Sequence, residues 1–453
     1  MKTHVFLVIV GVFGCSAVPV QDATGVASEP GESTGPGGSS SSTGQDTIVG
    51  ASSGESSGTA TSSTSAADDV ASDSTTEGTK FDTAIEGTTG EPSCGGAGGT
   101  PDFSYAWVAN GCLSDVQDCA HSSVSKIDTQ SLTELARYQT RPDGHGNPSR
   151  TSVNLNGDMA VANRFGGLTK IYAREQDCPD ASNTSSGPED VKPWGDGCMA
   201  WHTPMEYTSQ RAVAWTQGTF NEQTCMYEDT RIWTAGVANN QIEVLLVDGD
   251  TGAVLEAVPV AGVDAGTYGI YGGAVDGEGN FWGAQWNSGS LVRVRLDDLT
   301  VDSWPVPITG YGMTVDSMGR PWVCSSETAR FDPATETFTI GDGNPDGGSG
   351  CMDDGNGRIW IAGRSVVGID LETMTEVASY LVPLVNGNVD TGYTRGISFD
   401  YAGYIWAPAH WANRAYRIDP DTGEFDWVDG LQFPYTYSDM TGFGLSNAGV
   451  PAG

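Results

Sequence analysis

The chain has 453 residues and a formal net charge of −37, from 58 acidic and 21 basic residues. Such a surface repels polyanions, which argues against nucleic acid and anionic lipid headgroups as partners. Thirteen tryptophans and many β-branched runs suit β-structure, and nine cysteines suit an exported protein.

Residues 1–15 are typical of a bacterial signal segment. Their apolar run, residues 5–13, is too short to span a bilayer. Residues 12–15 resemble a lipoprotein lipobox, which implies cleavage before Cys15 and a diacylglycerol on its sulfur. Ser16 after this cysteine resembles cargo sent to an outer membrane, so we expect an anchored protein of the cell envelope. Ordinary secretion with cleavage after Ala17 is the alternative.

Residues 16–93 are built mainly of Ser, Gly, Thr, Ala and acidic residues, with Lys80 as the only basic residue. Such a segment buries too little apolar surface to offset the entropy of ordering it. We therefore expect a disordered, self-repelling tether between the anchor and a folded domain at residues 94–453.

The folded domain repeats the pattern D-x-x-G-x-x-W. Four full copies follow one another at intervals of roughly 40 residues, as in arrays of repeated units. They begin at Asp276, Asp316, Asp354 and Asp400. Each copy predicts a tight turn between two apolar runs, and two more runs complete a four-stranded antiparallel unit. The tryptophan is expected between neighbouring units.

Units of this length predict the blades of a β-propeller. Weaker copies at Asn154 and Asp229, together with a split copy, bring the count to seven blades. The split copy joins Trp107 near the start of the domain to residues 442–449 at its end. We therefore expect both termini to share one blade, with the C-terminal strand innermost, so that the ring closes.

Eight cysteines remain besides Cys15, an even number that predicts four disulfides. Position favours two pairs, Cys112–Cys119 and Cys324–Cys351. The absence of C-x-x-C spacing argues against a zinc site. The eight are Cys94, Cys112, Cys119, Cys178, Cys198, Cys225, Cys324 and Cys351.

Insertions interrupt the repeat at residues 174–197 and 221–228. Long loops on a rigid ring are common binding sites, and the alternative is a surface loop fixed by a disulfide. The acidic runs at residues 248–252 and 419–423 suggest calcium loops, but their position between third and fourth strands favours hairpin turns.

Residues at the start of the innermost strands should face the axial channel. Arginines converging there would form an anion or carbonyl site, although such an arginine can also pair with an acid such as Asp439. The candidates for ligand binding are Arg150, Arg211, Tyr271, Tyr311, Ser349, Arg395 and Thr441.

His410 ends a second strand near the channel mouth and is the candidate general base. A surface histidine without a catalytic role is the alternative. The domain carries no H-E-x-x-H motif and no phosphate loop, so the sequence leaves open whether the protein is an enzyme.

The pattern G-x-x-x-D-x-x-G-x-x-W followed by R-I-D-P-x-T-G resembles the repeats of virginiamycin B lyase and related streptogramin lyase-like propellers. Residues 396–423 carry it most fully. The resemblance implies a seven-bladed monomer. In that family, a divalent cation and a His/Glu group on the axial face open a cyclic depsipeptide ester by elimination. This chain has no Glu-x-His motif or close His pair to match that group.

Two functions follow. The first is a module that binds a small molecule or protein at the axial channel, attached to the membrane only through its lipid. The second is a lyase or lactonase with Mg²⁺ or Ca²⁺ in that channel. Three or more carboxylates or imidazoles gathered there would favour the enzyme, whereas Arg, Tyr and backbone groups would favour the binding module.

Overall fold

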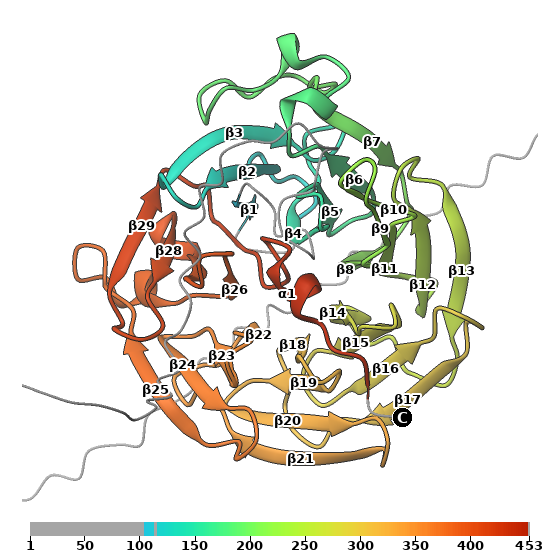
Figure 1. The fold of residues 1–453 in the computed structure, drawn as a ribbon, viewed down its shortest axis with the longest axis vertical. Helices are drawn as coiled ribbons and strands as arrows, with labels where there is room; N and C mark the ends of the chain where they lie inside the picture. Colours follow the sequence, from blue (N-terminus) through green and yellow to red (C-terminus); the bar gives the residue numbers. More distant parts are fainter. Residues whose placement is uncertain (1–103, 113–115, 452–453) are drawn as a thin grey trace, which may run out of the picture. The chain divides into compact units, whose positions relative to one another are not determined.

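A computed structural model describes residues 104–112 and 116–451. Seven antiparallel sheets follow one another around a ring, with their first strands nearest the centre (Figure 1). This confirms the predicted seven-bladed propeller. The predicted signal segment, lipidation site and tether lie outside the described residues. No helix in the described part of the chain is long and apolar enough to cross a membrane.

The first three blades carry the irregular features of the ring. Blade 1 has β1 (Tyr105–Asn110), β2 (Ser123–Asp128) and β3 (Thr133–Gln139). Blade 2 has β4 (Pro148–Val153), β5 (Met159–Asn163), β6 (Leu168–Ile171) and β7 (Met199–Thr203). Blade 3 has β8 (Ser209–Trp215), β11 (Arg231–Ala238), β12 (Gln241–Asp248) and β13 (Val254–Val260). The hairpin of β9 (Thr219–Asn221) and β10 (Met226–Glu228) interrupts blade 3.

The other four blades are regular. Blade 4 has β14 (Ile270–Val275), β15 (Phe281–Gln285), β16 (Ser290–Val294) and β17 (Val301–Pro305). Blade 5 has β18 (Gly312–Val315), β19 (Pro321–Cys324), β20 (Glu327–Asp332) and β21 (Thr337–Asp342). Blade 6 has β22 (Cys351–Asp353), β23 (Arg358–Ile361), β24 (Ser365–Asp370) and β25 (Glu376–Leu381). Blade 7 has β26 (Ser398–Phe399), β27 (Ile405–Ala409), β28 (Arg414–Ile418) and β29 (Phe425–Asp429). Short 3₁₀ turns η3 (Val389–Gly392) and η4 (His410–Ala412) lie in loops.

The repeated Asp and Trp make one local unit. In each full copy the aspartate accepts backbone amides two and four residues later and the indole N–H six residues later. The indole bonds are 2.8 Å for Trp282–Asp276 and for Trp322–Asp316, 3.0 Å for Trp360–Asp354 and 2.9 Å for Trp406–Asp400. Each tryptophan is fully buried and packs on the next blade, as predicted.

The ring closes through both ends of the domain, but not as the repeat pattern predicts. Residues 432–440 line the inner edge of β1: the Trp107 amide donates to Met440 O at 2.8 Å, and the Tyr435 amide donates to Ala109 O at 2.9 Å. The prediction that residues 442–449 form the innermost strand is therefore wrong. Residues 443–447 form helix α1 (Phe443–Asn447), which lies at the centre of the ring (Figure 1).

The chemistry of Asp439 accounts for this difference. Its carboxylate accepts the amides of Gly442 at 2.9 Å and Leu445 at 2.8 Å. Gly442 has φ +87°, a value that suits glycine, so the chain turns out of the strand direction. The five helical residues include no β-branched side chain, so nothing in them resists a helical turn.

Three disulfides join described cysteines: Cys112–Cys119, Cys178–Cys198 and Cys324–Cys351. The first and third were predicted from position. Cys225 is also disulfide-bonded, and Cys94 lies outside the described residues.

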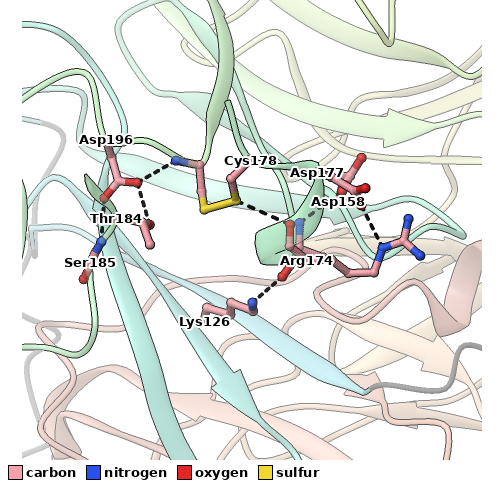
Figure 2. Close-up of a disulfide and its surroundings, with 10 residues drawn as sticks. Lys126, Asp158, Arg174, Asp177, Cys178, Thr184, Ser185 and Asp196 are labelled. Carbon is pink, nitrogen blue, oxygen red and sulfur yellow. Dashed lines mark hydrogen bonds and ion pairs between the residues drawn. A yellow bond between two sulfur atoms is a disulfide. The ribbon is translucent and has the colours of Figure 1, made fainter. Parts of the chain in front are cut away.

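The insertion after β6 is a compact loop held by its own bonds (Figure 2). It contains the short 3₁₀ turns η1 (Glu175–Asp177) and η2 (Ala181–Asn183). The Asp196 carboxylate accepts from the Thr184 hydroxyl at 2.8 Å, the Ser185 amide at 2.9 Å and the Cys198 amide at 2.9 Å. The disulfide and this carboxylate together fix the loop.

Candidate functional site

The starts of the innermost strands and the ends of the second strands lie at one face of the ring. The antiparallel register shows this, because Pro148 pairs with Asn163, Ile270 with Gln285, and Gly312 with Cys324. The side chains that gather there form what we call the axial mouth. It comprises Arg150, Arg164, Arg211, Tyr271, Tyr311, Arg395, Tyr435 and Tyr437.

The channel below the mouth is largely filled. Helix α1 and side chains from the inner strands leave a cavity of about 40 Å³, whose lining includes Ser152, Thr314, Asp439 and Leu445. A water molecule needs roughly 10–15 Å³ on this measure, so the cavity holds a few waters at most. This cavity is too small for an organic ligand, and the mouth above it is the candidate binding site.

Arg150 is the most buried cation of the mouth and is 1% exposed. Its Nε and Nη2 donate to Tyr271 O at 3.2 and 2.9 Å, and its Nη1 donates to Ser149 O at 3.1 Å. The guanidinium carbon lies 3.2 Å from the ring centroid of Tyr437. Burial lowers the pKa of Arg150 to about 9. The side chain is fixed by backbone carbonyls and not by the predicted kind of acidic partner.

Three tyrosine hydroxyls meet beside Arg150. The Tyr435 hydroxyl lies 3.2 Å from that of Tyr271 and also hydrogen-bonds that of Tyr311. Burial raises the pKa of Tyr271 to about 12 and that of Tyr311 well above its ordinary value. Burial opposes ionisation of Tyr435 as well, but the charges of Arg150 and Arg164 and the bonds from the other two hydroxyls outweigh it and lower its pKa.

The other predicted arginines of the mouth differ in exposure. Arg211 is 3% exposed and lies over the ring of Tyr268, with 4.3 Å between the guanidinium carbon and the ring centroid. Arg395 is half-buried, with its guanidinium carbon 5.8 Å from the ring of Tyr393. Among the described residues, no carboxylate lies within 4.0 Å of the Arg395 guanidinium. Arg395 is therefore the cation best placed to meet an anion from solvent.

His410 lies in the wall of the mouth, and 4% of it is exposed. The centroid of its ring lies 5.4 Å from that of Tyr435, in an edge-to-face arrangement, and 5.6 Å from that of Phe433. Burial lowers the pKa of His410 to about 4, and the charges of Arg164 and Arg395 add to that effect. The imidazole is therefore neutral at neutral pH and contacts the mouth through Tyr435.

The remaining predicted candidates are buried and do not reach solvent at the opening. Ser349 is fully buried, and the Thr441 hydroxyl lies 2.9 Å from the Ser398 hydroxyl, near α1. Asp439, the acid suggested as an arginine partner, instead accepts the backbone amides that begin α1.

The carboxylates in the described part of the ring form no metal site. No group of three or more His, Cys, Asp or Glu residues there could hold a metal ion. The acidic runs once suggestive of calcium are hairpin turns: the Asp248 carboxylate accepts the Thr251 amide, and the Asp419 carboxylate accepts the Thr422 amide. The axial mouth is lined by Arg, Tyr and backbone groups, which is the arrangement expected of a binding module.

The fold and this mouth define the protein as a seven-bladed β-propeller with an arginine- and tyrosine-lined axial site. No family model and no curated protein matches its sequence. The fold is similar to a catalytically inactive virginiamycin B lyase from Staphylococcus aureus with quinupristin, at 14% identity and TM-score 0.45 over 62% of this chain and 84% of that one.

Two further solved structures are similar. A streptogramin B lyase matches at 13% identity and TM-score 0.46 over 74% of this chain and 91% of its own. A functionally unknown protein from Desulfotomaculum acetoxidans matches at 10% identity and TM-score 0.50 over 74% and 97%. The lyase propellers that the repeats resemble are thus among the similar structures, and at these identities the likeness shows the fold alone.

Proposed function

We propose that this chain is an exported, lipid-anchored β-propeller of the cell envelope that binds a small anionic ligand at the axial mouth. One observation carries the proposal: on a chain of net charge −37, Arg150, Arg164, Arg211 and Arg395 gather at a single opening. The cationic site attracts anions to this opening, whereas the acidic surface of the rest of the ring repels them.

The chemistry of the mouth suits a carboxylate with an apolar body. The Arg395 guanidinium offers several donors to a carboxylate. Trp286 and Trp411 are 41% and 45% exposed. Trp286 lies 6.1 Å from Tyr271 and Trp411 lies 6.5 Å from Phe433, between ring centroids. Each indole offers apolar surface beside an aromatic residue of the mouth or its wall.

A metal-dependent lyase or lactonase is the other function that the sequence suggests. It would need carboxylates or imidazoles gathered in the channel, and the described residues place Arg and Tyr there instead. We therefore favour the binding module.

Replacing Arg395 with glutamine is expected to weaken the binding of benzoate, citrate or inorganic phosphate by about 10- to 100-fold. A hydrogen bond to a charged group contributes about 1.5–3 kcal/mol, and the substitution removes the accessible charge. Titration calorimetry at low ionic strength measures the effect. Arg414→Gln is the control, because Arg414 pairs with Asp429 at 2.8 Å on the outer part of blade 7. Equal affinities in the wild type and Arg395→Gln would rule out this site.

Anchoring is tested separately at the N-terminus. Mass spectrometry of protein isolated from bacterial membranes is expected to show a chain that begins at Cys15 and carries diacylglycerol on its sulfur. Cys15→Ser is expected to release the protein into the soluble fraction, since the acyl chains supply the membrane affinity. An unmodified chain that begins after Ala17 would contradict the anchor and leave the binding site untouched.

A further inference from the structure

Tyr435 occupies an unusual place in the axial mouth, because its hydroxyl is the meeting point of two others. It belongs to the segment that closes blade 1, where the Ala109 amide donates to the Thr436 hydroxyl at 2.8 Å and the Tyr435 amide donates to Ala109 O at 2.9 Å. These bonds to β1 fix the chain at Tyr435 and at Thr436. Tyr435 is also partly exposed, whereas Tyr271 is 6% exposed.

The number of hydrogen-bond donors around the Tyr435 oxygen favours its ionised form. A neutral phenol has one proton to donate, and an oxyanion accepts from several donors. The hydroxyls of Tyr271 and Tyr311 both lie within hydrogen-bonding distance of the Tyr435 oxygen. When both donate to Tyr435, its oxygen is doubly stabilised as an oxyanion. Burial keeps both donors protonated, because it raises the pKa of Tyr271 and of Tyr311.

The charges around Tyr435 favour the same form. Arg164 lies 4.9 Å and Arg150 lies 5.9 Å from its ring centroid, measured from the guanidinium carbon. His410 faces the ring from η4 and is neutral, and Tyr437 faces it from the same segment. These side chains include no carboxylate. The pKa of Tyr435 is lowered accordingly, in spite of its burial.

We propose that Tyr435 is the proton acceptor of the axial mouth, and that the mouth takes an aromatic carboxylate bearing an acidic hydroxyl, as in a hydroxybenzoate. The ligand class rests on the proposed function, because Arg395 holds the carboxylate. The exposed indole of Trp411, on the same blade as Arg395, supplies apolar surface for the aromatic body. The ionised oxygen of Tyr435 accepts the hydroxyl of the ligand.

The proton transfer balances without a further reactant. The ligand O–H bond breaks, its electron pair stays on the ligand oxygen, and the proton forms the O–H bond of Tyr435. The guanidinium groups of Arg150 and Arg164 stabilise the negative charge before the transfer, when it lies on Tyr435. They remain close to it afterwards, when it lies on the ligand oxygen.

Two measurements test the proposal on the full chain. Absorbance at 295 nm during a pH titration is expected to show an early phase, in which one tyrosine ionises below the pH range of ordinary tyrosines. Tyr435→Phe is expected to remove this early phase. Calorimetry is expected to show 4-hydroxybenzoate binding at least about tenfold more tightly than benzoate, because the extra hydrogen bond is made to a charged oxygen. Tyr435→Phe is expected to make the two affinities equal.

Control variants separate the role of Tyr435 from damage to the fold. Tyr404→Phe, at the turn before β27 and below Arg417, is expected to leave both measurements unchanged. Tyr311→Phe removes one donor and is expected to raise the pH of the early phase by about one unit. This second variant keeps the test decisive if Tyr435→Phe does not fold.

The outcomes distinguish this inference from the proposed function. An absent early phase, or one that persists in Tyr435→Phe, overturns the proton acceptor. Equal binding of benzoate and 4-hydroxybenzoate to the wild type, with both lost in Arg395→Gln, overturns the ligand class and supports the anion site. If neither acid binds, the ligand class fails. Binding of citrate or phosphate then decides the anion site, and the pH titration decides whether Tyr435 ionises.

Discussion

Replacing Trp406 with alanine is expected to lower the free energy of unfolding by about 3–5 kcal/mol, the range for large aromatic side chains removed from a core. Trp406 lies on β27 and is fully buried against Ala106, Val108 and Ile127 of blade 1. The substitution leaves a cavity where the last blade meets the first. It also deprives the buried Asp400 carboxylate of the indole N–H, its donor at 2.9 Å. Urea unfolding followed by far-UV circular dichroism measures the change.

Trp427→Ala is the matched control, because Trp427 lies on the outermost strand β29 and is 45% exposed. We expect a loss below about 1 kcal/mol there, as for other exposed positions. Asp400→Asn keeps the tryptophan packing and weakens the bonds to the carboxylate, so an intermediate loss of about 1–2 kcal/mol is expected. Equal losses for Trp406→Ala and Trp427→Ala would contradict a core placed between the blades.

The blade count could be predicted because its cause is local. Each full copy of the repeat holds an aspartate, a glycine with positive φ and a tryptophan within seven residues, and the bonds among them form inside the copy. Even the weak copy at Asn154 keeps its turn, since the Asn154 side chain accepts the Asp158 amide at 2.8 Å. The copy has Ala160 in place of the tryptophan, and Trp215 of blade 3 donates to the nearby Ser152 O at 3.0 Å.

The closing segment could not be predicted, because its partners lie more than 300 residues away. Residues 442–449 share the spacing of a repeat copy. This similarity led to the prediction that they, and not residues 432–440, form the innermost strand. The bonds that decide the outcome join Ala109 to Thr436 and Trp107 to Met440. No local pattern in residues 432–440 indicates such distant partners.

The site residues that belong to the repeat could be predicted, and those outside it could not. Arg150, Tyr271, Tyr311 and Arg395 occupy equivalent positions near the starts of inner strands, so the repeat brings them together in space. Tyr435 and Tyr437 lie in the closing segment, outside the repeat. Arg164 follows the second strand of a weak copy and was missed. The aromatic run from Phe433 to Tyr437 was the available signal in the sequence. The Cys178–Cys198 disulfide was missed for a similar reason, because it lies in an insertion.

A chain that ends at Gly430 is expected to lose cooperative unfolding altogether. The truncation removes the inner edge of blade 1, leaving the Trp107 amide and Ala109 O without their backbone partners. It also removes Tyr437, over which Arg150 lies, and helix α1 from the channel. An exposed strand edge and an unshielded buried charge together cost several kcal/mol, comparable with the whole stability of a typical domain, about 5–15 kcal/mol. Urea titration and limited proteolysis measure the loss.

A chain that ends at Asn447 is the matched control. It keeps residues 432–440 and α1, and it loses the contacts of Gly449 with the Gly277 amide at 2.7 Å and with Asp316 O at 3.1 Å. Two hydrogen bonds at the surface contribute about 1–3 kcal/mol, so this chain is expected to unfold cooperatively at a lower urea concentration. If the chain ending at Gly430 unfolds at the same midpoint as this control, then blade 1 is stable without its closing segment.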